Sequence, residues 1–136
     1  MINKYTAAII AIMLFIIGMS GGCAVDSPDG SGQESKNGAA EPVIVNGAEA
    51  RELLEKNDNA VLLDVRNQNE FDEGHIDGAI LIPVDRLKSR LSELPDQNAV
   101  IIVYCRAGSR SATASAILAE NGYTNVYDMG GIVNWK

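Results

Sequence analysis

Along residues 42–136, continuous runs of apolar residues alternate with stretches in which apolar residues recur at helical spacing. Continuous apolar runs, typical of strands buried on both faces, occur at residues 43–45, 60–65, 79–82, 99–104 and 126–127. Stretches with apolar residues at helical spacing lie between these runs, at residues 47–57, 69–73, 84–94 and 109–121. Such alternation of strands and helices predicts an α/β domain built on a parallel sheet that is covered by helices.

The N-terminal segment has a different pattern. Lys4 precedes an apolar run from Ala7 to Ile17, and small residues then lead to Cys23. This is the plan of a secretory signal peptide, and the run is shorter than the roughly 20 residues that span a bilayer. The segment resembles a bacterial lipoprotein signal, although Ser20 stands where an aliphatic residue is common. The resemblance implies that residues 1–22 are removed and that Cys23 is lipidated.

Two other interpretations of the N-terminal segment stay open. One is an uncleaved N-terminal anchor, and the other is cleavage near Gly22 that leaves Cys23 as a free thiol. Residues 23–41 are rich in Gly, Ser and Asp and nearly devoid of apolar side chains, so we expect a flexible linker. The expected location is therefore extracytoplasmic, in the periplasm or on the outer face of the cell membrane, with the membrane contacted through the lipid anchor.

Composition excludes several function classes. The 136 residues carry a formal net charge of -7, which argues against a nucleic-acid partner because phosphate backbones require clustered Lys and Arg. The chain has two cysteines and one histidine, too few for a structural zinc site or a disulfide scaffold. We therefore expect no metal and no disulfide.

The candidate catalytic residue is Cys105, which follows directly on the strongest strand pattern, residues 99–104. Ligands of parallel sheets bind at the carboxyl ends of strands, and the N-terminus of a following helix attracts anions. Ser109 or Ser111 is the expected N-cap of that helix, and Gly108 permits a tight turn. We expect this setting to lower the pKa of Cys105 and make it a nucleophile for an anionic substrate. The alternative is a buried cysteine that acts only as a small apolar residue.

Three separate motifs resemble those of the rhodanese family. They are VLLDVRNQNEFDEGHIDGAILIP at residues 61–83, YCRAGSRSATASAILAENGY at residues 104–123, and MGGIVNWK at the C-terminus. The resemblance covers residues 42–136, which we expect to be the rhodanese domain. It implies the rhodanese-like α/β fold, with a central parallel β-sheet flanked by helices on both faces, and sulfurtransferase activity.

The resemblance also implies a mechanism and a set of site residues. Sulfur from thiosulfate or polysulfide is carried as a persulfide on Cys105 to a thiophilic acceptor such as a thiol, cyanide or a protein. No cofactor is required. The substrate-binding loop comprises Arg106, Ala107, Gly108, Ser109 and Arg110. Arg110, and with it Arg106, is expected to hold the sulfonate end of the donor.

Other polar residues near the motifs are interpreted as structural. Asp64 and Arg66 are expected to pair and so position the loops near Cys105, while His75 forms local hydrogen bonds. Glu70 and Asp72 are expected on a solvated or helix-capping surface. Trp135 is expected to pack at the C-terminus.

The sequence leaves two competing functions to consider. Cysteine phosphatases of related folds place five residues between Cys and Arg, whereas four separate Cys105 from Arg110, so the loop should be too small for a phosphate ester. The second alternative is a non-enzymatic module that binds sulfur species or a partner protein. The presence of Cys105 within an intact loop argues for the enzyme.

Overall fold

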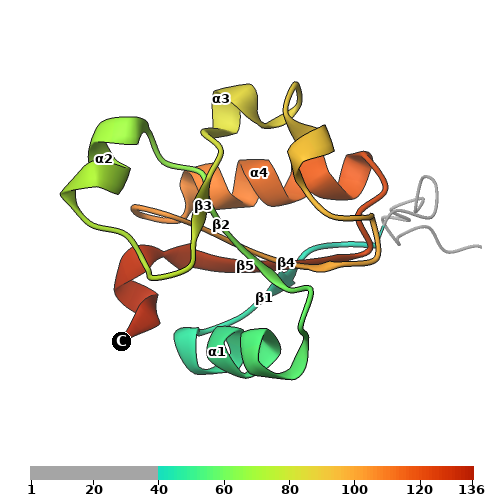
Figure 1. Ribbon diagram of the computed structural model, residues 1–136, viewed down its shortest axis with the longest axis horizontal. Coiled ribbons are helices and arrows are strands. Elements are labelled where there is room, and N and C mark those ends of the chain that lie inside the picture. The colour runs from blue at the N-terminus through green and yellow to red at the C-terminus, as the bar shows by residue number, and fades with distance from the viewer. Residues whose placement is uncertain (1–39) are drawn as a thin grey trace, which may run out of the picture. The chain divides into compact units, whose positions relative to one another are not determined.

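The computed structural model describes residues 40–136, which form a parallel sheet with helices on both faces (Figure 1). The sheet order is β1-β5-β4-β2-β3, and all four pairings are parallel. The strands are β1 (Val43–Ile44), β2 (Val61–Asp64), β3 (Ile80–Leu81), β4 (Val100–Cys105) and β5 (Asn125–Gly131). The fold class expected from the chain is therefore confirmed. The predicted signal peptide, Cys23 and almost all of the predicted linker lie outside the described residues.

The helices follow the strands in the predicted order. They are α1 (Gly47–Lys56), α2 (Gln68–Glu73), α3 (Val84–Leu87) and α4 (Ser109–Glu120), with 3-10 turns η1 (Leu91–Glu93) and η2 (Ile132–Trp135). Both α1 and α2 begin with a capping box, in which an asparagine caps the helix and a glutamate three residues later caps the asparagine in return. No helix within residues 40–136 is long and apolar enough to cross a bilayer.

Side chains of β4 alternate between two hydrophobic clusters, one on each face of the sheet. Ile101, Val103 and Cys105 point toward the cluster that contains residues of α3 and α4. Ile102 and Tyr104 point toward the cluster that contains residues of α1 and η2. Figure 1 shows the same arrangement, with α3 and α4 on one side of the sheet and α1 and η2 on the other. All five of these side chains are at most 1% exposed, so β4 is the buried centre of the sheet.

The helix predicted over residues 84–94 is wrong as a single element. It divides into α3 and η1, because local and tertiary hydrogen bonds compete with the helical ones. The Ser89 hydroxyl donates to the Arg86 carbonyl at 2.8 Å, and the Tyr123 hydroxyl donates to the Leu91 carbonyl at 3.1 Å. The apolar spacing is the same in both arrangements, so it does not reveal the division.

Strand β5 extends beyond the predicted residues 126–127. Its longer extent follows from its position between β1 and β4, which pair with it on both sides. The pairing with β4 shifts register after Val103, where Met129 is an extra residue on β5. This irregularity aligns Cys105 with Gly131 at the end of the sheet.

Candidate active site

Cys105 is the last residue of β4, at the edge of the sheet where the central strands end. Asp64, the last residue of β2, pairs in register with Tyr104, and Gly131, the last residue of β5, pairs with Cys105. The parallel arrangement thus collects three strand ends around the cysteine. The structure places Cys105 at the position where parallel sheets bind ligands.

The loop after Cys105 turns at Gly108, which adopts φ 107° and ψ -25° and is the N-cap of α4. The N–H of Gly108 donates to Cys105 Sγ at 3.0 Å. The prediction that Ser109 or Ser111 caps the helix is wrong, because the chain reaches α4 through this left-handed glycine. The Ser111 hydroxyl instead donates to the Gly108 carbonyl at 2.8 Å and closes the turn.

The surroundings of Cys105 favour its thiolate. Burial raises the pKa of the Cys105 thiol, whereas hydrogen bonds from the loop lower it, first among them those from the backbone N–H groups of Ser111 and Gly108. The Ala107 N–H acts in the same direction, and the net pKa lies below that of an ordinary cysteine. The cysteine is 1% exposed, so this thiolate is protected from bulk water. The loop is therefore suited to hold a nucleophilic sulfur and any sulfur atom added to it.

The thiolate of Cys105 should form at lower pH than that of a free cysteine. Because its pKa is lowered, the thiolate is the major species above the shifted pKa and is lost as the pH falls through it. We expect the ultraviolet absorbance of the thiolate to titrate with a midpoint below that of an unperturbed cysteine thiol. The Cys105→Ser variant supplies the blank. A midpoint at or above the free-thiol value would contradict the assigned hydrogen bonds.

The underside of the loop contacts the glycine pair at the end of β5. A Cβ atom on Gly131 would lie 2.9 Å from the Arg106 carbonyl oxygen, closer than real Cβ contacts allow. Gly130 has φ 78°, a value that favours glycine, and its N–H donates to Asp128 at 2.8 Å. The glycine pair therefore allows the cysteine loop to pack directly on the end of the sheet.

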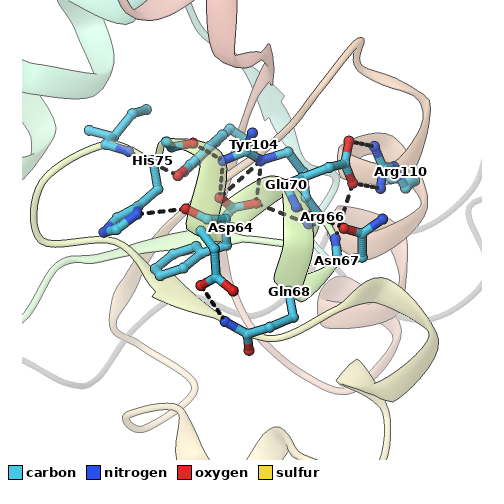
Figure 2. Close-up of polar contacts among 12 residues, drawn as sticks. Asp64, Arg66, Asn67, Gln68, Glu70, His75, Tyr104 and Arg110 are labelled. Carbon is cyan, nitrogen blue, oxygen red and sulfur yellow. Dashed lines mark hydrogen bonds and ion pairs between the residues drawn. The ribbon is translucent and has the colours of Figure 1, made fainter.

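The five predicted substrate-binding residues differ in their surroundings. Arg106, Ala107 and Ser109 are exposed, whereas Gly108 and Arg110 are partly buried. Arg110 does not project freely over Cys105: its guanidinium donates to both carboxylate oxygens of Glu70, at 2.6 and 2.8 Å. Figure 2 shows this pair between α2 and α4.

Glu70 is a helix-capping residue, as expected, but it is not on a solvated surface. Its carboxylate accepts from the Asn67 N–H at 3.2 Å, and its side chain is 13% exposed. The hydrogen bond from Arg110 lowers the pKa of Glu70 to about 2. The spacing from Asn67 to Glu70 signals the cap, but no local pattern signals the ion pair with Arg110.

Asp64 and Arg66 pair as expected and belong to a buried polar network (Figure 2). Arg66 Nη2 donates to Asp64 at 2.7 Å and to the Gly74 carbonyl at 2.8 Å. The Arg66 guanidinium also lies 5.6 Å from the centre of the Tyr104 ring. Burial, with a hydrogen bond to Asp64, raises the pKa of Tyr104. Tyr104 is a member of this network that the sequence motifs did not indicate.

His75 and Trp135 have structural contacts, as expected. The His75 ring stacks on Phe71 with 3.7 Å between ring centres, and its Nδ1 is 2.9 Å from the Phe71 carbonyl oxygen. Trp135 packs under the guanidinium of Arg51, 4.9 Å from the ring centre. The polar contacts of His75 are therefore with its own segment, and Cys105 is a candidate nucleophile without a histidine partner within residues 40–136.

A pocket of about 280 Å³ lies beside the loop. It is lined by Arg66, Glu70, Glu73, Gly74, Arg106 and Ile132. Both charged and aliphatic side chains therefore surround it. Among residues 40–136 no group of three His, Cys, Asp or Glu side chains could hold a metal ion.

Comparison with known proteins agrees with this geometry. The family model of the rhodanese-like domain matches residues 46–136. Thiosulfate sulfurtransferase PspE of Escherichia coli is 42% identical over 71 residues, which are 52% of this chain and 68% of PspE. The structure of the human single-domain sulfurtransferase TSTD1 matches with a TM-score of 0.61 and 29% identity, covering 71% of this chain and 95% of TSTD1.

Relatives with another activity match over a smaller share of their length. The tRNA uridine(34) hydroxylase of Buchnera aphidicola is 40% identical over 86 residues, which are 59% of this chain but 28% of the hydroxylase. The similarity is therefore confined to a part of that protein. The match over residues 46–136 and the relationship to PspE establish that this chain belongs to the rhodanese-like domain family.

Proposed function

We propose that the protein is a sulfurtransferase that carries sulfane sulfur from thiosulfate or polysulfide to a thiophilic acceptor as a persulfide on Cys105. The observation that carries the proposal is the setting of Cys105 at the end of β4. Its sulfur accepts a hydrogen bond from the Gly108 N–H at 3.0 Å, and the pKa of its thiol is lowered. Membership of the rhodanese-like family and relatives named as sulfurtransferases support the same reaction class.

The first half-reaction forms one sulfur–sulfur bond and breaks another. The Cys105 thiolate attacks the outer sulfur of thiosulfate, and the electron pair of the broken bond leaves with sulfite. The negative charge of the product lies on the outer persulfide sulfur, to which backbone N–H groups of the loop can donate hydrogen bonds. In the second half-reaction a nucleophilic acceptor attacks that outer sulfur, and the Cys105 thiolate is released.

The test is sulfur uptake followed by intact mass measurement. The purified protein is incubated with excess thiosulfate or polysulfide, and the donor is removed. We expect a mass gain of one sulfur atom that disappears when cyanide is added. A protein that gains no sulfur from either donor would contradict the proposal and favour a non-enzymatic binding module.

A phosphatase receives less support. Such enzymes bind the phosphate through the arginine of the loop, and in this protein both oxygens of Glu70 already occupy the guanidinium of Arg110. The turn from Cys105 to Gly108 also places a backbone N–H on the sulfur itself. These contacts suit a single added sulfur atom better than a phosphate ester.

The proposed location is extracytoplasmic, with lipidated Cys23 anchoring the domain to a membrane. It rests on the signal-like pattern of residues 1–22 and on the position of Cys23 after small residues. Two or more acyl chains anchor stably, whereas one binds only marginally. We expect the chain to take up radiolabelled palmitate in bacterial cells and to lose both label and membrane association in Cys23→Ser. A labelled or membrane-bound Cys23→Ser variant would contradict lipidation at that residue.

A further inference from the structure

The charges around Cys105 are largely balanced before any substrate binds. The side chains of the loop, its supporting network and the adjoining pocket include three arginines and three carboxylates: Arg66, Arg106 and Arg110, with Asp64, Glu70 and Glu73. Arg66 is paired with Asp64, and Arg110 is paired with Glu70. Arg106 forms no ion pair within residues 40–136. One guanidinium out of three is therefore left to attract an anion.

The Glu70 carboxylate is held in place independently of Arg110. It accepts the Asn67 N–H at the start of α2, and Asn67 in turn accepts the Glu70 N–H at 2.9 Å. Arg110, which lies 40 residues further along the chain, binds this carboxylate through two hydrogen bonds. Such fork-to-carboxylate pairing fixes the direction of the guanidinium.

The position of Arg110 matters for the charge near the sulfur. Arg110 follows the loop after Cys105 and is the second residue of α4, and the Cys105 thiolate is among the charges that raise the pKa of Arg110. A free Arg110 would attract an anionic donor toward the thiolate. Paired with Glu70, it offers that donor little net charge, because the two opposite charges are in contact.

We propose that Glu70 determines donor specificity: by holding Arg110 in an ion pair, it favours an alkyl hydropersulfide over thiosulfate as the donor to Cys105. The inference rests on the proposed sulfurtransferase function and names the donor class. Thiosulfate carries two negative charges and must approach a thiolate, so it depends on positive charge in the loop. A hydropersulfide carries at most one negative charge on its reactive group, so its reaction depends much less on positive charge in the loop.

The pocket next to the loop fits the organic part of such a donor. Its volume of about 280 Å³ approaches the lower limit of typical ligand pockets, and Ile132 supplies an aliphatic contact beside Arg106 and Glu73. The transfer balances without a further reagent. The Cys105 thiolate bonds to the terminal sulfur of the hydropersulfide, the electron pair of the broken bond leaves with the alkyl thiolate, and the proton passes to that thiolate.

The test compares two donors in three proteins. Wild type, Glu70→Gln and Glu49→Gln are each reacted with thiosulfate and with cysteine hydropersulfide, and the second-order rate of mass gain is measured. The amide in Glu70→Gln removes the charge but can still cap Asn67, because glutamine serves in a capping box. Glu49 is the matched control, since it forms the same capping box with Asn46 in α1 and has no arginine partner within residues 40–136.

We expect Glu70→Gln to react about tenfold faster with thiosulfate and within about twofold of wild type with the hydropersulfide. Glu49→Gln should change neither rate. The gain with thiosulfate should shrink at high salt, which a purely structural role of Glu70 would not produce. An unchanged thiosulfate rate, or an equal change with both donors, would overturn the proposal. Wild-type protein that takes up sulfur from neither donor would instead contradict the sulfurtransferase function itself.

Discussion

The Cys105→Ser variant is expected to gain no sulfur from thiosulfate, polysulfide or a hydropersulfide, with transfer to cyanide reduced at least about 10³-fold. A serine hydroxyl stays protonated at neutral pH and cannot form the persulfide. The hydrogen bonds that lower the pKa of Cys105 cannot compensate, because a hydroxyl is far less acidic than a thiol. Intact mass after donor removal measures the uptake, and thiocyanate production measures the transfer.

The second cysteine of the chain provides the matched control. Purified Cys23→Ser should gain one sulfur atom at the wild-type rate, because Cys23 precedes the rhodanese-like domain, which begins at residue 46. Cys105→Ser should also unfold at nearly the same urea concentration as wild type, since serine differs little in size from cysteine. Sulfur uptake that survives in Cys105→Ser and is lost in Cys23→Ser would show that Cys23 carries the sulfur, and would contradict this prediction.

Arg66→Met is expected to lower the free energy of unfolding by about 3–5 kcal/mol, measured by urea denaturation. Arg66 and Asp64 are 6% and 0% exposed, so the substitution leaves a carboxylate buried without its opposite charge. It also removes the donor to the Gly74 carbonyl. Methionine retains much of the length of the arginine side chain, so little of the effect should come from lost volume.

Arg90→Met is the control for this prediction. Arg90 donates to both carboxylate oxygens of Glu93, at 2.6 and 2.7 Å, but the two side chains are 38% and 50% exposed. Exposed pairs of this kind contribute about 0.2–1 kcal/mol, because water already solvates both partners. If Arg66→Met and Arg90→Met lowered the free energy of unfolding equally, the burial of Asp64 would not be the cause of the destabilisation in Arg66→Met. The double variant Asp64→Asn/Arg66→Met should recover part of the stability, since no unpaired charge then remains.

The two predictions concern different properties of the same strand ends. Cys105 lies on the face of β4 that packs against α3 and α4, whereas Tyr104, with Arg66 near its ring, lies toward the opposite face. We therefore expect Arg66→Met mainly to lower the stability of the fold, and Cys105→Ser to abolish sulfur transfer without lowering stability.

Local sequence was sufficient for the order of elements and for the chemical character of the loop. The apolar run before Cys105 predicts the central strand, since a strand buried on both faces places apolar residues in succession. Gly108 predicts the turn, and the following small residues predict the helix. These features depend on neighbours along the chain, which is why they could be recognised before the structure was known.

Other features depend on packing between distant segments. The division of residues 84–94 depends on a hydrogen bond from Tyr123, and the length of β5 on pairing with two neighbouring strands. The cap of α4 is Gly108 because the loop packs on Gly131, not because of any serine preference.

The hydrogen-bond partner of the Arg110 side chain is the clearest case of a feature decided by tertiary structure. Its place in the loop motif predicted a donor-binding side chain, and the charge of Glu70 predicted a surface or a cap. Folding brings α2 close to the start of α4, so that Glu70 and Arg110 form an ion pair although they are 40 positions apart in the sequence. An arginine can pair with any accessible carboxylate, so the choice of partner is set by which one the folded chain holds within reach.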